Sequence, residues 1–138
     1  MTYPSAIRSV LKAMNGLAKA DATLVALING GQILDKVPAG TSMPYVRFVS
    51  TTEVDEGSTF SKDGRVDTVT MAIWTDYAGE QQGLLILEEL NRVLHKQVLT
   101  LDVGVCLLCW YEWSDSLEDP DGEAQQVMVR YRVQALEA

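Results

Sequence analysis

Two cysteines stand three positions apart in Cys106-Leu107-Leu108-Cys109, a spacing that redox-active pairs and zinc sites use. A thioredoxin-type pair lies at a helix N-terminus, whereas the neighbours here are apolar, aromatic and β-prone. Residues i and i+3 of a regular strand point to opposite faces, too divergent to bridge or to bind one ion. A zinc site also needs two further ligands, and the chain has one histidine. We therefore predict two small strand residues, buried or half-buried.

That histidine, His95, is predicted in the last turn of a helix, where a cation meets the negative end of the helix dipole. A structural role is therefore favoured over that of a catalytic base. The sequence contains no nucleophile elbow, phosphate-binding loop, dinucleotide fingerprint or zinc-protease motif. We predict no enzymatic activity, no cofactor and no metal site.

Acidic side chains gather in two stretches that turn-forming residues predict to be loops. Charged side chains in such turns are normally solvated. The second stretch lacks the spacing and the terminal glutamate of an EF-hand, which disfavours a calcium site. The first stretch contains Glu53, Asp55, Glu56, Lys62 and Asp63, and the second contains Glu118, Asp119, Asp121 and Glu123.

Aromatic and basic side chains concentrate in the last two predicted strands, and Trp74 ends the strand predicted over 65–74. The rings of Trp74, Trp110, Tyr111 and Trp113 could line a ligand pocket, but strand aromatics more often belong to a core or a subunit contact. Arg130 and Arg132 are predicted to point outward from the last strand. They could pair with acidic groups of a neighbouring copy, or simply belong to a solvated strand face.

A strand and a helix within residues 65–95 form the predicted centre of the fold. Val69, Met71 and Ile73 alternate with smaller or polar residues in 65–74, which is typical of a half-buried strand. After Gly79, apolar residues recur at steps of three and four, which predicts one face of a helix. The strand and the helix are expected to bury against each other. The apolar helix positions are Leu84, Leu87, Leu90 and Leu94, with Ile86 and Val93 beside them.

The remaining elements are predicted from the same patterns. Helices are expected over 3–19 and 22–28, the second one capped by Asp21. The polar segment 50–64 is longer than a usual hairpin connection and predicts an extended, flexible loop between two strands. Further strands are predicted over 32–35, 45–49, 97–101, 105–114 and 124–136. In the last of these, Val127, Val129, Tyr131 and Val133 are expected to point inward.

These elements predict one α+β domain over residues 1–138, with two or three helices on a mainly antiparallel sheet of about four to six strands. The formal net charge of −8 argues against a general nucleic-acid binder, because duplex affinity comes mainly from Lys and Arg. Neither a signal peptide nor an apolar run long enough to cross a membrane occurs. Cytosol-like conditions are therefore expected.

The order of these elements resembles the tail-terminator, or tail-completion, proteins of long-tailed phages and gene transfer agents. The similarity covers nearly the whole chain and is one of pattern, without an invariant catalytic signature. Its elements are the apolar first helix, the segment 21–28 ending in Gly30-Gly31-Gln32-Ile33, Pro38, the strand opening Pro44-Tyr45-Val46, a polar loop, a strand ending in Ile73-Trp74, Gly79 before a leucine-rich helix, an acidic turn, and Arg130-Tyr131-Arg132.

The resemblance implies a structural virion protein that caps the head-proximal end of the tail tube as a ring, usually of six copies, and is assembled in the host cytoplasm. Its expected partners are the tail tube protein and the head connector or stopper, while DNA passes through the lumen without specific binding. We expect a subunit interface at Trp110, Trp113, Arg130 and Arg132. The residues expected to line the lumen or dock on the tube are Glu53, Asp55, Glu56, Lys62 and Asp63.

Two alternatives remain. The chain could be another small connector or a tube subunit, which would stack into open polymers. It could instead be a small ligand-binding or enzymatic domain that uses Trp74, Trp110 and Trp113. The second alternative requires those rings to line a closed pocket.

Overall fold

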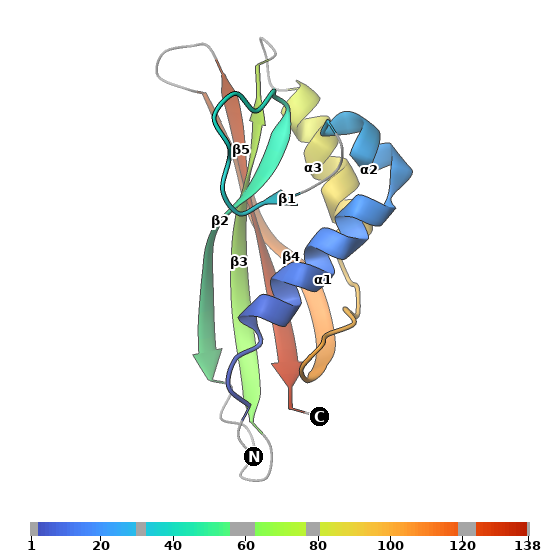
Figure 1. Ribbon diagram of the computed structural model, residues 1–138, viewed down its shortest axis with the longest axis vertical. Coiled ribbons are helices and arrows are strands. Elements are labelled where there is room, and N and C mark those ends of the chain that lie inside the picture. Colours follow the sequence, from blue (N-terminus) through green and yellow to red (C-terminus); the bar gives the residue numbers. More distant parts are fainter. Residues whose placement is uncertain (1–2, 30–32, 56–62, 77–80, 119–123, 138) are drawn as a thin grey trace.

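The computed structural model describes residues 3–29, 33–55, 63–76, 81–118 and 124–137. In these residues, three helices lie together on one face of a five-stranded sheet (Figure 1). The helices are α1 (Ile7–Ala20), α2 (Ala22–Leu27) and α3 (Gln81–Leu94). The strands are β1 (Ile33–Leu34), β2 (Tyr45–Asp55), β3 (Gly64–Thr75), β4 (Val105–Glu118) and β5 (Gln125–Leu136).

The strands lie in the order β1-β2-β3-β5-β4. β1 is parallel to β2, and every other neighbouring pair is antiparallel. The two long strands of each hairpin, β2 with β3 and β4 with β5, are therefore joined into one sheet by the pairing of β3 with β5. The predicted α+β class, with its strand and helix numbers, is confirmed.

The helix side of the sheet holds the core. β5 alternates as predicted: Val127, Val129, Tyr131 and Val133 are all buried. β3 contributes Val69, Met71 and Ile73 to the same core, each with no exposed surface. α1 packs onto them because its apolar residues recur at steps of four. Its buried apolar residues are Val10, Met14 and Ala18.

α3 presents a slightly different face to the core from the one predicted. Gly83 packs so closely on β5 that a Cβ there would lie 2.8 Å from Cγ2 of Val127. With Gly83 against the sheet, Ile86, Leu90 and Leu94 are buried behind it. Leu84 is one residue, or about 100°, further round the helix and is 36% exposed. The prediction that Leu84 lies in the core is therefore wrong.

Three predicted boundaries also need correction. α1 begins at Ile7, because residues 3–6 are non-helical and use their backbone groups to contact β2 and β3. β2 continues to Asp55, so most of the expected loop before residue 56 is strand paired with β3. The expected strand over 97–101 does not form: only Gln97 pairs, with Cys109, and the following residues leave the sheet as Leu99 enters the core.

Two bulges in β4 change which way its side chains point. The pairing with β5 skips Leu107 and Glu112. Each extra residue reverses the alternation beyond it. Cys106 and Cys109 therefore point to the same face, opposite Ala135 and Val133, and both are buried as free thiols. Their predicted burial is confirmed, but the expectation of opposite faces is wrong.

Replacing Tyr131 with phenylalanine is expected to lower the free energy of unfolding by about 1–2 kcal/mol. The buried Tyr131 hydroxyl donates to Oδ1 of Asn91 on α3, and the variant leaves that amide oxygen without its partner. Urea unfolding followed by circular dichroism measures the change. Tyr45→Phe is the matched control, since the Tyr45 hydroxyl makes no hydrogen bond within the described part of the chain. Equal stability of the two variants would contradict this role of the hydroxyl.

Candidate interaction surface

The face of the sheet opposite the helices gathers the four residues predicted as a subunit interface. Trp110 lies opposite Arg132 in the β4–β5 register, and Trp113 lies opposite Arg130. The bulge at Glu112 makes this possible, because a regular strand would point Trp110 and Trp113 to opposite faces. β4 and β5 thus position the four side chains as one contiguous group, which we call the Trp-Arg patch.

The two cations of the Trp-Arg patch are already engaged within the chain. The Arg130 guanidinium lies 5.0 Å from the centre of the Trp113 ring, a cation–π contact. Arg132 forms an ion pair with Glu112 at 2.8 Å. Both pairs are partly exposed, so their net energies are modest. They orient the side chains, and they leave the Trp113 ring 41% exposed.

Exposed apolar side chains continue beyond the patch on the same face. Leu117 on β4 is 42% exposed and Val54 on β2 is 58% exposed. They lie at opposite sides of the sheet and at opposite ends of its strands. Within one copy they do not form a contiguous apolar patch, so they would be covered only if the two sides of the sheet met in neighbouring molecules.

Each outer long strand of the sheet is covered along only part of its length. β1 pairs with Val46 and Arg47 of β2. Gln97 pairs with Cys109 of β4, and Nδ1 of His95 accepts the Tyr111 N–H at 2.8 Å. Within the described ranges, nothing pairs with residues 112–118 of β4 or 50–55 of β2 on their outer sides. We call these stretches the free edge of β4 and the free edge of β2.

The acidic residues predicted for the lumen make contacts within the chain where the structure describes them, and two of them bond to the N-terminal segment. Glu53 is on β2, and its Oε2 accepts the Ala6 N–H at 2.8 Å. Asp55 forms an ion pair with Arg65 at 2.9 Å, and Oδ2 of Asp63 accepts the Tyr3 N–H at 3.2 Å. Glu53 and Asp55 thus lie in a strand rather than in the expected loop. Asp55 stays mostly exposed, whereas Glu53 is turned inward.

A buried carboxyl group that the sequence analysis missed belongs to the same cluster. Asp67 of β3 lies opposite Glu53 and has no exposed surface. Within the described structure, neither of its oxygens receives a hydrogen bond from a donor group. Burial, and then the neighbouring Glu53, raise the pKa of Asp67 to about 8 against the opposing effect of Arg65. Asp67 therefore holds a proton at neutral pH, which it can donate to Glu53. Its place in an alternating strand was the only sequence signal.

Several predicted positions lie outside the described residues. Glu56 and Lys62 of the first acidic stretch are among them, as are Asp119, Asp121 and Glu123 of the second. Glu118 is the last residue of β4. Glu118 therefore lies in a strand rather than in the expected turn, and the rest of the acidic turn stays a prediction.

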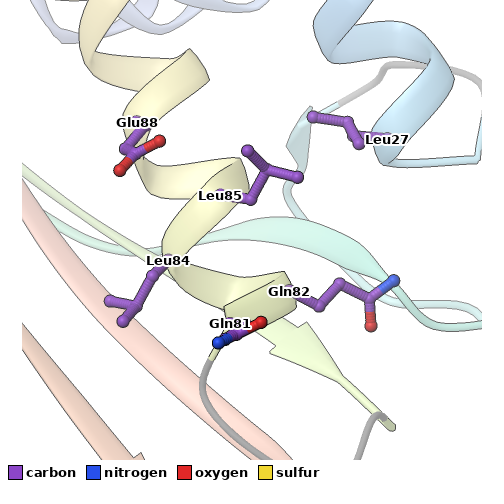
Figure 2. Close-up of a pocket in the computed structure, with 6 residues that line it drawn as sticks. All are labelled: Leu27, Gln81, Gln82, Leu84, Leu85 and Glu88. Atoms are coloured by element: carbon purple, nitrogen blue, oxygen red, sulfur yellow. The ribbon is translucent and has the colours of Figure 1, made fainter.

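A groove of about 610 Å³ lies between α2 and α3. Figure 2 shows Leu85 of α3 and Leu27 of α2 pointing toward each other across it. Gln81, Gln82, Leu84 and Glu88 complete the lining. A ligand site built from tryptophans would need Trp74, Trp110 and Trp113 to line the groove. None of the three does.

The remaining reactive groups serve the sheet. Burial raises the pKa of the Cys106 thiol and that of Cys109, the latter to about 12, so neither is a ready nucleophile. His95 uses Nδ1 to accept an N–H at the edge of β4, a structural role. In the described part of the chain, no group of His, Cys, Asp and Glu side chains could hold a metal ion. No described helix is long and apolar enough to cross a membrane.

This chain resembles known proteins both in sequence and in fold. The family model described as "Tail completion protein gp17" matches residues 12–134. Among solved structures, a chain of the "Virion of native gene transfer agent (GTA) particle" superposes with a TM-score of 0.87. The two chains are 21% identical, and the match covers 98% of this chain and 99% of the other. No curated protein sequence matches.

Proposed function

The chain belongs to the tail completion protein gp17 family, and from this premise we propose that it caps the head-proximal end of a tail tube as a closed ring. It is a structural protein of a phage-type tail rather than an enzyme. In the proposed role, the ring stops tube polymerisation and offers its other side to the head connector. The solved structure with the same fold comes from a gene transfer agent virion, which is in keeping with this role.

The observation that carries the proposal is the uncovered face of the sheet. On that face Trp113, Leu117 and Val54 are all more than 40% exposed, and subunit contacts would cover them. They lie at different sides of the sheet, so one copy offers two distinct surfaces. A ring needs such a pair of different surfaces on every copy, because its contacts are head-to-tail. We propose that the Trp-Arg patch belongs to one of these subunit contacts.

The lumen of the ring has to pass DNA without holding it. The formal net charge of −8 suits that task, since an acidic surface repels phosphate. Between Glu53 and Asp55, Asp55 is the better candidate for the lumen or for tube docking, because its side chain is 68% exposed. Glu53 is bonded to Ala6 and would act indirectly, by holding the N-terminal segment.

Native mass spectrometry of the purified chain over a range of concentrations tests the proposal, with negative-stain images of the same samples. We expect a discrete closed species, of six copies if the family pattern holds, with a central hole. Open-ended stacks would instead favour a tube subunit. A monomer at all concentrations, also in the presence of tail tubes, would overturn the proposal.

A further inference from the structure

We propose that neighbouring copies join by strand addition, with the free edge of β4 of one copy pairing antiparallel to the free edge of β2 of the next. The partner is therefore a second copy of this chain, and the contact would make one continuous sheet around the ring. This inference rests on the proposed ring and specifies how its subunits meet. The register of the sheet and the unpaired backbone groups at its two edges support it.

β4 has backbone groups that point away from β5 and stay unpaired within the described residues. Cys109 exchanges two hydrogen bonds with Gln97, of 2.7 and 3.2 Å, and Tyr111 donates its N–H to His95. These bonds mark the β4 residues whose backbone points away from β5. Because outward and inward groups alternate in an antiparallel pair, the next outward residues after the bulge at Glu112 are Ser114 and Ser116. Neither has a backbone partner on that side among the described residues.

β2 likewise has backbone groups that point away from β3 and stay unpaired within the described residues. The residues of β3 and β5 pair one to one along their whole length, so the alternation can be followed across both strands. It leaves the backbone of Thr51, Glu53 and Asp55 pointing away from β3. β1 covers β2 only at Val46 and Arg47. The two free edges therefore carry outward groups at the same two-residue spacing.

The strand directions of neighbouring copies also match. The pairs β2–β3, β3–β5 and β5–β4 are each antiparallel, so β4 runs opposite to β2. Copies in a ring are related by a rotation about the ring axis, which brings β4 of one copy beside β2 of the next. The two strands then meet antiparallel, as neighbouring strands of this sheet already do.

The side chains of the two free edges fit each other in one register. Pairing Ser116 with Glu53, and Ser114 with Asp55, uses the outward groups of both edges in register. Asp115 then lies opposite Val54, and no two like charges face each other in these pairs. Trp113 and Leu117 become the diagonal neighbours of Val54, within reach of large side chains. Trp113, Leu117 and Val54, which one copy leaves 41%, 42% and 58% exposed on this face, thus cover one another.

The offset between neighbouring copies allows the joined sheets to close into a ring. Within one copy, Ser116 is level with Val46 through the pairs Ser116–Val127, Val127–Ile73 and Ile73–Val46. In the contact it is level with Glu53, which is six ladder positions further along β2 once the bulged Val49 is left out. Six residues span about 20 Å, and the four long strands of a copy span about 19 Å. The resulting strand tilt of about 45° is within the range that closed barrels use.

This offset also explains why each edge is only partly covered. Shifting the neighbour along the strands leaves its β1 beyond the C-terminal end of β4. The residues around Gln97, which pair with β4 at Cys109, lie beyond the other end of the contact. Both covering segments thus protect the parts of the edges that the neighbouring copy would not reach, as isolated proteins protect edge strands.

Cross-linking tests the contact. In the variant Asp115→Cys with Val54→Cys, the two thiols lie on directly opposed residues of neighbouring copies, about 4.5 Å apart between Cα atoms, close enough for a disulfide. We expect a mild thiol oxidant to link copies into a ladder ending at the ring number on non-reducing gels. The native cysteines are buried. Controls are both single variants and Asp115→Cys with Val98→Cys, because Val98 is exposed next to the segment that covers β4.

The outcomes separate this inference from the proposed function. A ring in native mass spectrometry whose double variant forms no ladder would overturn strand addition and leave the ring standing. Absence of any ring would overturn both. In addition, Ser116→Pro removes an N–H that the monomer does not use, so we expect a folded chain with at least tenfold weaker assembly. A fully assembled Ser116→Pro ring would also contradict strand addition.

Discussion

Replacing Asp67 with asparagine is expected to raise the free energy of unfolding by several kcal/mol at pH 9 and to change it little at pH 4. Burial and the opposed Glu53 raise the pKa of Asp67 to about 8, far above its ordinary value. The folded protein thus keeps a proton that the unfolded chain releases near pH 4. Its free energy of unfolding must therefore fall as the pH rises from about 4 to 8, and level off above.

Asparagine removes this penalty because its amide is never charged and can still donate to Glu53. The charged and titratable groups that surround the site are Glu53 on β2, Arg65 on β3 and Tyr3 before α1, and all three stay in place. Urea unfolding at several pH values measures the difference between the curves. Asp35→Asn, at an exposed position, is the control and should change stability by less than about 0.5 kcal/mol. Parallel pH curves for the native chain and Asp67→Asn would refute the buried proton.

Replacing Gly104 with alanine is expected to lower the free energy of unfolding by about 3–4 kcal/mol. Gly104 has φ +88°, and a Cβ there would lie 2.6 Å from the Leu136 carbonyl oxygen and against the Tyr3 ring. The Tyr3 hydroxyl donates to the Val103 carbonyl at 2.8 Å, so the ring cannot easily retreat. The variant must therefore loosen the contact of the N-terminal segment with the start of β4.

A matched control separates the clash from the backbone strain. Gly40 has φ +83° and open space where a Cβ would be. Gly40→Ala should therefore cost only the left-handed conformation, about 1 kcal/mol. Both variants are compared by thermal and urea unfolding. Equal losses would mean that the packing of Gly104 contributes nothing.

The regular parts of the fold followed from the sequence. The alternation in β3 and β5, the step-of-four pattern in α1 and the Asp21 cap of α2 are local signals, and each is present in the structure. The Asp21 Oδ1 atom accepts the Leu24 N–H at 3.0 Å, as an N-cap should. Such signals depend on neighbours within a few residues. They are therefore readable without knowledge of the tertiary contacts.

The irregular parts did not follow, because tertiary contacts decide them. The β4 bulges depend on pairing with β5, and they alone put Trp110 and Trp113 on one face and the two cysteines on the other. The exposure of Leu84 depends on the close approach of Gly83 to Val127. The four residues of the Trp-Arg patch were predicted by residue type, but their contiguity was not. The polar composition of 50–55 favoured a loop, whereas its pairing with β3 makes it strand.

Locating the chain on growing tail tubes shows whether it ends them at the head-proximal end. The chain would be tagged at its C-terminus, labelled with gold, mixed with polymerising tail tube protein and imaged by electron microscopy. We expect label at one end of each tube, and we expect tubes to stop growing once they are labelled. Label along the tube walls, at both ends, or on tubes that keep growing would contradict it.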